Sequence, residues 1–334
     1  MSNPIARLGS EMPVALAPMA GITDLPFRNL VTRLGAGMVV SEMVASQELI
    51  TNGRDARSRA ELGAGLEATA VQIAGREAGP MAECARMVAD LGARSIDINM
   101  GCPAKKVTNG WSGSALMRNL DHALGLIDAV VGAVDVPVTL KTRLGWDETS
   151  INAPELARRA EAAGVAMITI HGRTRCQFYR GQADWAAIAA VKAAVSVPLL
   201  ANGDIVDAST ARTALARSGA DGVMIGRGIQ GQPWLLSQVG AELAGQPVPD
   251  APAGEALADL IGTHHEAMLS FYGRDLGIRN ARKHLGWYLD RIGGGGARRP
   301  EIMRGTDPAA VMRAVRAAVR DAPLAGDLPQ RTAA

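Results

Sequence analysis

Short apolar runs recur along the chain, and each is followed by a loop and a longer amphipathic stretch rich in Ala and Leu. Eight runs predict strands, over residues 14–19, 38–43, 68–73, 95–99, 136–142, 166–171, 197–201 and 222–225. Helices are predicted between them, for example over 81–91, 122–134, 154–163 and 208–218. Several end in a Leu-Gly-Ala or Ala-Gly-Val step, as a glycine cap before the next strand requires. Eight such units predict an α/β fold, the TIM (β/α)8 barrel.

The pattern changes after the eighth unit, which closes near Gly240. A Pro- and Gly-rich link is followed by helical periodicity over 255–292, then by a flexible GGGGARRP segment and a last basic helix near 308–320. No strand pattern appears there. We therefore expect a small all-helical domain after the barrel. The predicted boundaries are 1–243 for the catalytic barrel, 244–254 for the linker, 255–322 for the helical domain and 323–334 for a disordered tail.

Polar residues occupy the inward positions at the ends of several predicted strands. In the segment VPVTLKTR, alternation places Thr139, Lys141 and Arg143 on the face that points into the barrel. The same alternation turns inward Gln72, Asp97, Asn99, Met167, Thr169 and His171. Each buried polar group without a partner costs about 1–3 kcal/mol. Convergence of such side chains at the strand ends therefore indicates a pocket for a polar, planar ligand.

A cysteine interrupts the chain where the fourth predicted strand ends. Cys102 lies between a glycine and a proline, whereas a structural cysteine usually packs inside an apolar element. Barrel enzymes place their chemistry at this end of the strands. The other cysteines are Cys84 and Cys176, and the odd number and spacing argue against disulfides and a zinc site. Cys102 is therefore the candidate catalytic residue, and no metal is expected.

The last two predicted strands lead into glycine-containing loops, ANGDI (201–205) and MIGRGIQGQPW (224–234). Gly203 and Gly226 allow close backbone approach, and these two loops commonly form a barrel's phosphate site. The spacing of Gly226, Gly228 and Gly231 matches a dinucleotide fingerprint, but no βαβ unit follows, so we discount that match. A polar pocket for a planar ligand, combined with a phosphate site at the last two strands, favours flavin mononucleotide (FMN) over pyridoxal phosphate or a sugar phosphate. A phosphosugar isomerase could nevertheless use a similar barrel.

Composition adds limits rather than a function. The chain has 334 residues, 48% of them hydrophobic and 20% charged, which is typical of a soluble globular protein. The formal net charge is only +2, so a nucleic-acid surface would have to come from local clusters of basic residues. No signal peptide and no membrane-spanning run is found. We expect a cytoplasmic protein with no membrane association.

The ordered motifs resemble those of the tRNA-dihydrouridine synthases. They are LAPMAGITDLPFR, VQIAG, DINMGCPAKKV, LKTRLGW, ITIHGRT, ANGDI and MIGRG, and they span almost the whole chain. The segment ARKHLGWYL at 281–289 is most similar to the bacterial branch that includes the B-type synthases and the NifR3-like proteins. No motif position departs from the family pattern.

The resemblance implies an FMN barrel and a helical tRNA-binding domain that together reduce a uridine of tRNA to 5,6-dihydrouridine with electrons from NADPH. By the family pattern, the flavin would contact Pro18, Met19, Ala20, Gln72, Lys141, His171, Asn202, Gly203, Asp204, Gly226 and Arg227. Cys102 matches the catalytic cysteine. Asn99 and Arg143 match positions that hold the target uracil. The resemblance implies no obligate protein partner.

Reduction of the uracil C5=C6 bond needs a hydride and a proton. The flavin N5 would supply the hydride to C6, and Cys102 would supply the proton to C5. A thiol suits this role because, with an ordinary pKa near 8.5, it is largely protonated at neutral pH, whereas a carboxylic acid is ionised. A second possible role, a nucleophile activated by His171, would require a depressed thiol pKa.

A uridine inside folded tRNA must be flipped out to reach the barrel, so the protein must bind the surrounding backbone. Basic residues that could form a phosphate-binding rim are Lys105, Lys106, Arg173, Arg175, Arg180, Arg279, Arg282, Lys283 and His284. Trp287 and Tyr288 could stack on a base or pack in the helical core. Two other functions remain open, a flavin oxidoreductase of a free pyrimidine and a non-catalytic tRNA-binding protein. The sequence leaves open the tRNA position, NADPH versus NADH, and the oligomeric state.

Overall fold

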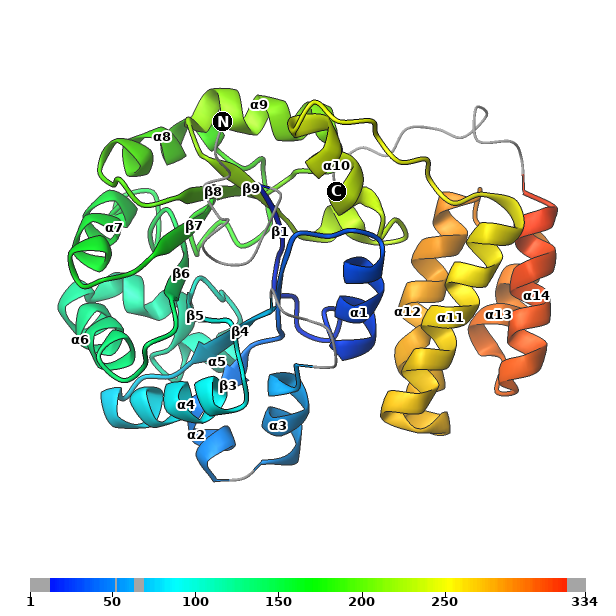
Figure 1. The fold of residues 1–334 in the computed structure, drawn as a ribbon, viewed down its shortest axis with the longest axis horizontal. Helices are drawn as coiled ribbons and strands as arrows, with labels where there is room; N and C mark the ends of the chain where they lie inside the picture. The colour runs from blue at the N-terminus through cyan, green and yellow to red at the C-terminus, as the bar shows by residue number, and fades with distance from the viewer. Residues whose placement is uncertain (1–12, 52, 63–68, 323–334) are drawn as a thin grey trace.

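The structure, a computed structural model, describes residues 13–51, 53–62 and 69–322. Eight parallel strands form a barrel (Figure 1): β1 Val14–Leu16, β2 Met38–Val40, β4 Thr69–Ala74, β5 Ser95–Met100, β6 Val138–Arg143, β7 Met167–His171, β8 Leu199–Asn202 and β9 Gly222–Ile225. Each pairs with the next along the chain, and β9 pairs with β1, which closes the barrel. The predicted TIM barrel is confirmed.

Every predicted run contains a strand, and the second run is followed by an additional short strand that was not predicted. There β2 ends at Val40, and a two-residue strand, β3 Val44–Ala45, pairs beside the end of β4. The first residue of the third run, at position 68, and the predicted tail at 323–334 lie outside the described residues, as do positions 1–12.

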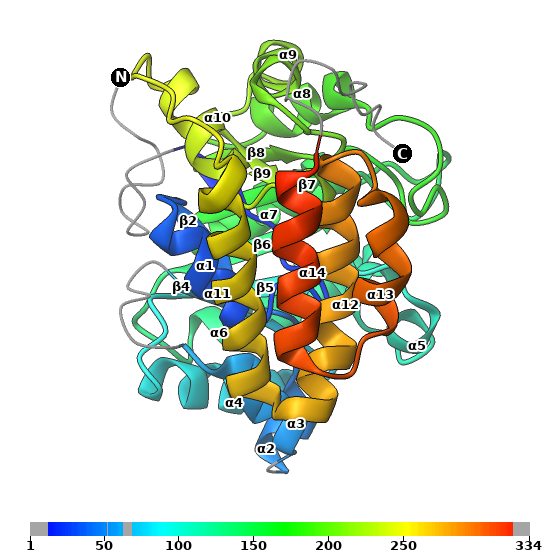
Figure 2. The ribbon, with the colours of Figure 1, turned by 90° about the vertical axis from the view of Figure 1, so that its right-hand side faces the viewer.

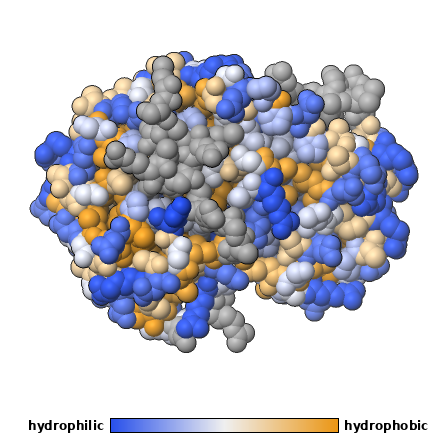
Figure 3. All heavy atoms as spheres, in the orientation of Figure 1, coloured by the Kyte–Doolittle hydropathy of each residue, from blue (hydrophilic) through white to orange (hydrophobic). Residues whose placement is uncertain are grey.

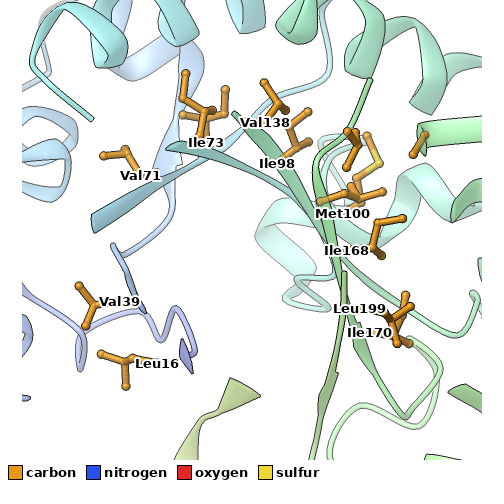
Figure 4. Packing of buried hydrophobic residues seen from close by; sticks show 14 of the residues in the cluster. Leu16, Val39, Val71, Ile73, Ile98, Met100, Val138, Ile168, Ile170 and Leu199 are labelled. Atoms are coloured by element: carbon orange, nitrogen blue, oxygen red, sulfur yellow. The ribbon is translucent and has the colours of Figure 1, made fainter. Parts of the chain in front are cut away.

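Alternation along the strands separates two hydrophobic layers. Outward-pointing side chains such as Val71, Ile98 and Ile168 are fully buried against the surrounding helices (Figure 4). A smaller interior cluster contains Ala15, Ala17, Met38, Val40, Ala70, Met167, Leu200 and Met224. These interior residues come mainly from β1, β2, β8 and β9, whereas β4 to β7 contribute mostly polar interior residues. The barrel therefore has one apolar and one polar inner wall.

Helices surround the barrel: α1 Leu25–Arg33, α2 Ser46–Ile50, α3 Arg54–Ala60, α4 Ala78–Asp90, α5 Lys105–Thr108, α6 Leu120–Val131, α7 Ala153–Ala162, α8 Trp185–Ala193, α9 Ala208–Ser218 and α10 Leu235–Leu243. The glycines that follow α1, α4 and α7 have φ values of +87° at Gly35, +96° at Gly92 and +102° at Gly164. Only glycine adopts such angles without strain, which explains the glycine steps predicted as caps.

The C-terminal part is a helical domain beside the barrel (Figures 1 and 2): α11 Gly254–Tyr272, α12 Arg274–Arg291, α13 Arg299–Arg304 and α14 Pro308–Arg320. The helical pattern predicted over 255–292 is divided at Gly273, where φ is +76°. Helix α13 was not predicted. Hydrophilic residues cover much of the outer edge of this domain in Figure 3. Among the described residues, no helix has the length and apolar composition needed to cross a membrane.

The helical domain packs on the barrel through α1, in a contact we call the seam. Phe27 of α1 lies against two histidines of the helical domain, with ring centroids 5.6 Å from His264 and 5.4 Å from His284. All three rings are buried. Near one end of the seam, the Tyr272 hydroxyl donates a hydrogen bond of 2.9 Å to Oδ2 of Asp24. The seam fixes the helical domain next to the loop that follows β1.

Candidate active site

A cavity of about 1030 Å³ opens at the carboxyl ends of the strands. Its volume is at the upper limit of the roughly 300–1,000 Å³ typical of small-molecule sites. Ala17, Met19 and Ile22, from β1 and its loop, contribute apolar lining, and Gln72 and Lys141 contribute polar lining. The predicted residues that line the cavity are Pro18, Met19, Ala20, Gln72, Asn99, Cys102, Lys141, Arg143, His171, Arg173, Asn202, Gly203, Asp204, Gly226 and Arg227.

A hydrogen-bonded chain runs along the polar wall. Asp97, buried below the cavity, accepts hydrogen bonds from Gln72 Nε2 at 2.7 Å and Thr139 Oγ1 at 2.6 Å. Burial raises the pKa of Asp97, and these hydrogen bonds act in the opposite direction. Oε1 of Gln72 accepts a 2.7 Å hydrogen bond from Nδ2 of Asn99. The orientation of the Gln72 amide is therefore fixed by its neighbours on both sides.

Asn99 also holds the loop that carries Cys102. Its Oδ1 accepts hydrogen bonds from the backbone N–H groups of Gly101 at 3.2 Å and Cys102 at 2.9 Å. From the other side, the carbonyl oxygen of Cys102 accepts hydrogen bonds from the Ser114 hydroxyl at 2.8 Å and backbone N–H at 3.1 Å. The Cys102 side chain is a partly exposed free thiol. The loop thus presents this thiol to the cavity in a fixed backbone conformation.

Lys141 and Arg143 bring positive charge to the same wall. Nζ of Lys141 donates a 3.1 Å hydrogen bond to Oδ1 of Asn202, two strands away. Burial first, and the nearby Arg143 charge second, lower the pKa of Lys141 to about 8. Burial also lowers the pKa of Arg143 to about 10, so both groups stay mainly cationic at neutral pH. Anionic or electron-rich ligand groups would be stabilised here.

The guanidinium of Arg143 is used within the protein. Its Nε donates to the carbonyl oxygen of Gly101 at 2.8 Å, and Nη1 donates to those of Thr174 at 2.9 Å and Phe178 at 2.8 Å. Arg143 therefore ties together the loops after β5 and β7. The family pattern assigns Arg143 and Asn99 to uracil binding, and that role stays a prediction. What the contacts establish is that both position the Cys102 loop.

A second charged group lies at the ends of β7 and β8. Nη2 of Arg173 donates to Oδ2 of Asp204 at 2.6 Å, and Nη1 donates to Nε2 of His171 at 3.2 Å. Arg227 lies 3.6 Å from the other carboxylate oxygen of Asp204. Burial and four neighbouring cations hold the pKa of His171 well below its ordinary value, so this imidazole is neutral. Because two arginines face the single carboxylate of Asp204, this end of the cavity carries a net positive charge.

This end of the cavity suits a phosphate. The backbone at Gly203 has φ +114°. At Gly226, an added Cβ would meet only ordinary contacts with Ala17 and Met19. Protein packing therefore does not require glycine at 226, and this glycine lines the cavity. The predicted residues thus fit a planar group with one apolar and one polar side and a phosphate tail.

Two residues predicted for a basic rim, Arg173 and His284, lie elsewhere, and Tyr288 takes the second of its two predicted positions, in the helical core. The Arg173 side chain is only 2% exposed, because it pairs with Asp204 inside the site, so it does not lie on an outer rim. His284 is buried in the seam, and burial holds its pKa well below its ordinary value, so it adds no positive charge. Tyr288 packs in the helical core, where its hydroxyl lies 3.1 Å from Nδ1 of His264.

Other basic residues remain at or near the surface. Arg175 is partly exposed and lies over the Trp146 ring, outside the cavity. Arg282 and Lys283 are partly exposed on α12, and the Lys283 ammonium points towards Gly21 in the loop after β1. Their binding to tRNA stays a prediction. The structure does not gather all the predicted basic residues on one surface.

An aromatic pair that the sequence pattern did not predict, Phe178 and Tyr179, also lines the cavity. The Tyr179 ring lies 5.6 Å from the Arg143 guanidinium carbon and 5.2 Å from that of Arg227. Arg291 of α12 also lines the cavity. The signal available was a long loop after β7 that contains two adjacent aromatics, but strand periodicity cannot place loop residues.

The comparisons with known proteins agree with this geometry. The family model described as "Dihydrouridine synthase (Dus)" matches residues 15–322. The chain belongs to the dihydrouridine synthase family. A "Probable tRNA-dihydrouridine synthase" of Rhodobacter capsulatus is 64% identical over 95% of this chain and 98% of its own length. One of Rhizobium leguminosarum bv. phaseoli is 57% identical over 96% and 98%.

The B-type branch of the family is also represented among the relatives. A "tRNA-dihydrouridine synthase B" of Xanthomonas campestris pv. campestris is 50% identical over 82% of this chain and 83% of its own length. The predicted membership of the family and of its B-type branch is confirmed, and the chain is an oxidoreductase of this family. Within the described part of the chain, no group of His, Cys, Asp and Glu could hold a metal ion.

Proposed function

We propose that this dihydrouridine synthase reduces the C5=C6 bond of a uridine in tRNA, with FMN as the bound cofactor and NADPH as the reductant. The observation that carries the proposal is the meeting of a free thiol, a half-buried lysine and a positively charged glycine-containing loop around one cavity. The names of its relatives, which are tRNA-dihydrouridine synthases, support tRNA as the substrate.

The cavity walls support FMN as the cofactor. Ala17 and Met19 would face the apolar part of the flavin ring, and the Gln72 amide and Lys141 ammonium its polar edge. Gly226 and Arg227 would hold the phosphate. FMN, when bound, supplies the hydride that uracil C6 accepts. The protein's part is to orient the ring, supply positive charge and exclude competing reactions.

Cys102 is proposed as the acid that protonates uracil C5. Its loop is held by Asn99 on one side and Ser114 on the other, so the thiol has a defined position. The charges of Lys141 and Arg143 both interact with Cys102. The thiolate that remains after proton donation would therefore lie beside positive charge, and solvent at the open cavity can return the proton.

The helical domain is proposed to orient the tRNA. The seam holds α12 beside the cavity, where Arg291 lines the wall and Lys283 reaches the loop after β1. Exposed basic residues on the same helix, such as Arg279, could bind phosphates further out. The target nucleotide would leave its stack and enter the barrel, as in other enzymes that act on a base.

The decisive experiment separates cofactor binding from tRNA reduction. The purified protein is scanned for flavin absorption, then mixed with NADPH and unmodified tRNA, and the tRNA nucleosides are analysed for dihydrouridine by mass spectrometry. We expect a yellow protein and dihydrouridine in tRNA, but none from free uridine. Product from free uridine would favour a free-pyrimidine reductase. A yellow protein that leaves tRNA unchanged, or a protein that binds no flavin after reconstitution, would overturn the proposal.

A further inference from the structure

An alternating stack of tryptophans and arginines lies outside the cavity. The guanidinium carbon of Arg118 lies 5.5 Å from the ring centroid of Trp111 and 5.0 Å from that of Trp146. The guanidinium carbon of Arg175 also lies over Trp146, 4.7 Å from its ring centroid. These four residues, Trp111, Arg118, Trp146 and Arg175, are called the stacking surface below. They come from three loops that are far apart in sequence.

The stacking surface is on the active-site end of the barrel. Trp111 and Arg118 belong to the segment after β5, Trp146 follows β6, and Arg175 follows β7, so all of them extend from carboxyl ends of strands. The segment that carries Trp111 is joined directly to the catalytic loop, because Ser114 hydrogen-bonds the carbonyl oxygen of Cys102. A ligand on Trp111 would therefore lie close to the entrance of the active site.

Trp111 is exposed in a way that packing does not explain. Its side chain is 56% exposed, and its backbone φ is +57°, in the left-handed region that bulky residues avoid. Such strain is most common at binding and catalytic sites. Phe178, which lines the cavity, has φ +59° and is also exposed. An exposed aromatic held on a strained backbone indicates that something outside the chain contacts it.

The charges around the stacking surface favour a nucleic acid as the occupant. Within the described residues, neither Arg118 nor Arg175 forms a salt bridge with a carboxylate. Lys105 and Lys106 lie exposed on α5, between Cys102 and Trp111 in the chain. The carboxylate of Asp147 bonds its own loop through Thr149 and Ser150. Tryptophan rings and arginine planes stack on bases, and the flanking cations match phosphates.

We propose that the stacking surface binds an unpaired base of the tRNA next to the uridine that enters the cavity, with that base stacked on Trp111. This inference rests on the proposed function, because it assumes tRNA at the barrel mouth. It assigns a specific role to the loop after β5. When the target uridine leaves its stack, the neighbouring bases lose a stacking partner. The exposed ring of Trp111 takes the place of that missing base.

The test compares tRNA binding by Trp111→Ala, Trp111→Phe and Leu91→Ala. Leu91 is the matched control, because it is a large apolar residue, 60% exposed, at the end of α4 that leads into the amino end of β5. We expect Trp111→Ala to weaken binding of unmodified tRNA about tenfold or more, as stacking contributions predict. Trp111→Phe should retain most of the affinity, and Leu91→Ala all of it. NADPH-driven flavin reduction should be unchanged in all three.

A spectroscopic readout separates stacking from a structural effect. Binding of tRNA should quench tryptophan fluorescence in the wild-type protein, and much of this quenching should disappear in Trp111→Phe although the tRNA still binds. Arg118→Lys, which keeps the charge but not the planar group, should weaken binding while leaving its salt dependence unchanged.

Two results would overturn the inference. Affinity of Trp111→Ala within twofold of wild type would mean that the ring faces a protein partner or nothing, and unchanged quenching in Trp111→Phe would mean that no base stacks there. Failure of the proposed function is a different outcome, because then the wild-type protein itself would form no dihydrouridine in tRNA.

Discussion

Two buried clusters of polar residues differ in how their hydrogen bonds are arranged. At the active site, Gln72, Asp97 and Asn99 form a continuous hydrogen-bonded chain that ends at the cavity. In the seam, the Nε2 atoms of His264 and His284 are buried, and neither has a hydrogen-bond partner among the residues that the structure describes. Both clusters contain groups whose pKa values are shifted by burial. A shifted pKa alone therefore does not distinguish a reactive site from a packed interface.

The two clusters differ in whether their side chains are accessible to a ligand and in whether their polar atoms have hydrogen-bond partners. The cavity cluster is held by bonds that leave a thiol and an ammonium facing open space, so the fixed geometry can act on a ligand. The seam histidines are neutral rings that fill space against Phe27. We therefore expect substitutions in the first cluster to change activity and substitutions in the second to change stability.

The largest effect is expected from Cys102→Ala. If Cys102 is the general acid, formation of dihydrouridine should fall about 10²- to 10⁴-fold, while flavin binding and NADPH oxidation stay near wild type. Single-turnover assays of flavin reduction and of tRNA reduction measure the two steps separately. Cys176→Ala is the control, because that thiol is exposed outside the cavity and should be replaceable. Full tRNA activity in Cys102→Ala would remove the assignment.

The next effect concerns stability at low pH and tests the seam. Burial lowers the pKa of His264 from 6.5 to about 3. As the pH falls, the imidazole of His264 is protonated in the unfolded chain before it is protonated in the folded protein. The contribution of His264 to the free energy of unfolding is therefore fully present above pH 6.5, and about 2 kcal/mol of it is lost at pH 5. Asp24, whose pKa burial raises to about 6, acts in the opposite direction and gains stability as pH falls. His171 and His284, whose pKa values are also held well below their ordinary value, act in the same direction as His264, so the change in the wild-type protein is not the His264 contribution alone.

A variant isolates the histidine contribution. His264→Gln should lose about 2 kcal/mol less than wild type between pH 7 and pH 5, measured by urea unfolding at equal flavin concentration. Because each protein is compared with itself, a constant cost of the substitution cancels. Equal pH slopes for the two proteins would show that His264 is not the titrating group.

A smaller effect is expected at the cavity from the Lys141 ammonium. With a pKa of about 8, Lys141 is mostly charged at pH 7 and mostly neutral at pH 9. Flavin-stripped protein should therefore bind FMN about tenfold more weakly at pH 9 than at pH 7. Lys141→Arg, which keeps its charge, should show a flat profile over this range. Fluorescence titration measures both, and a flat wild-type profile would contradict the prediction.

The smallest effect comes from one hydroxyl in each region. Tyr272→Phe removes the hydrogen bond to Asp24 in the seam and should lower the free energy of unfolding by about 1 kcal/mol. Tyr179→Phe makes the same chemical change at the cavity, on a side chain that is 48% exposed, and should leave stability unchanged. Equal losses in the two variants would mean that the seam and the cavity do not differ in this respect.

Strand periodicity was sufficient to predict the inward side chains. Lys141 and His171 were placed on the inner face by alternation alone, and both line the cavity. Cys102 was predicted at the active-site end of the barrel from its position between a glycine and a proline after a strand, and it lines the cavity, whereas its catalytic role stays a prediction. These predictions succeeded because a strand's alternation is a local property, and a barrel converts it directly into inside and outside.

Loop residues could not be placed in this way. Arg173 was predicted on an outer rim but pairs with Asp204, which is 31 positions away in the chain. The division of the helical pattern at Gly273 and the short helix α13 were also missed. Side chains in loops have no fixed period, so their direction depends on contacts that form only after the barrel closes.

The sequence by itself determined the eight strands, the polar inner wall and the position of the thiol, because backbone sterics and alternation act within each segment. Only the tertiary structure decided the rest. In the folded protein, Arg143 donates hydrogen bonds to three loop carbonyls. Arg118 lies between Trp111 and Trp146. His264 and His284 pack against each other as neutral rings. Each of these depends on segments distant in sequence, whose mutual distances are set by barrel closure and by the packing of the helical domain.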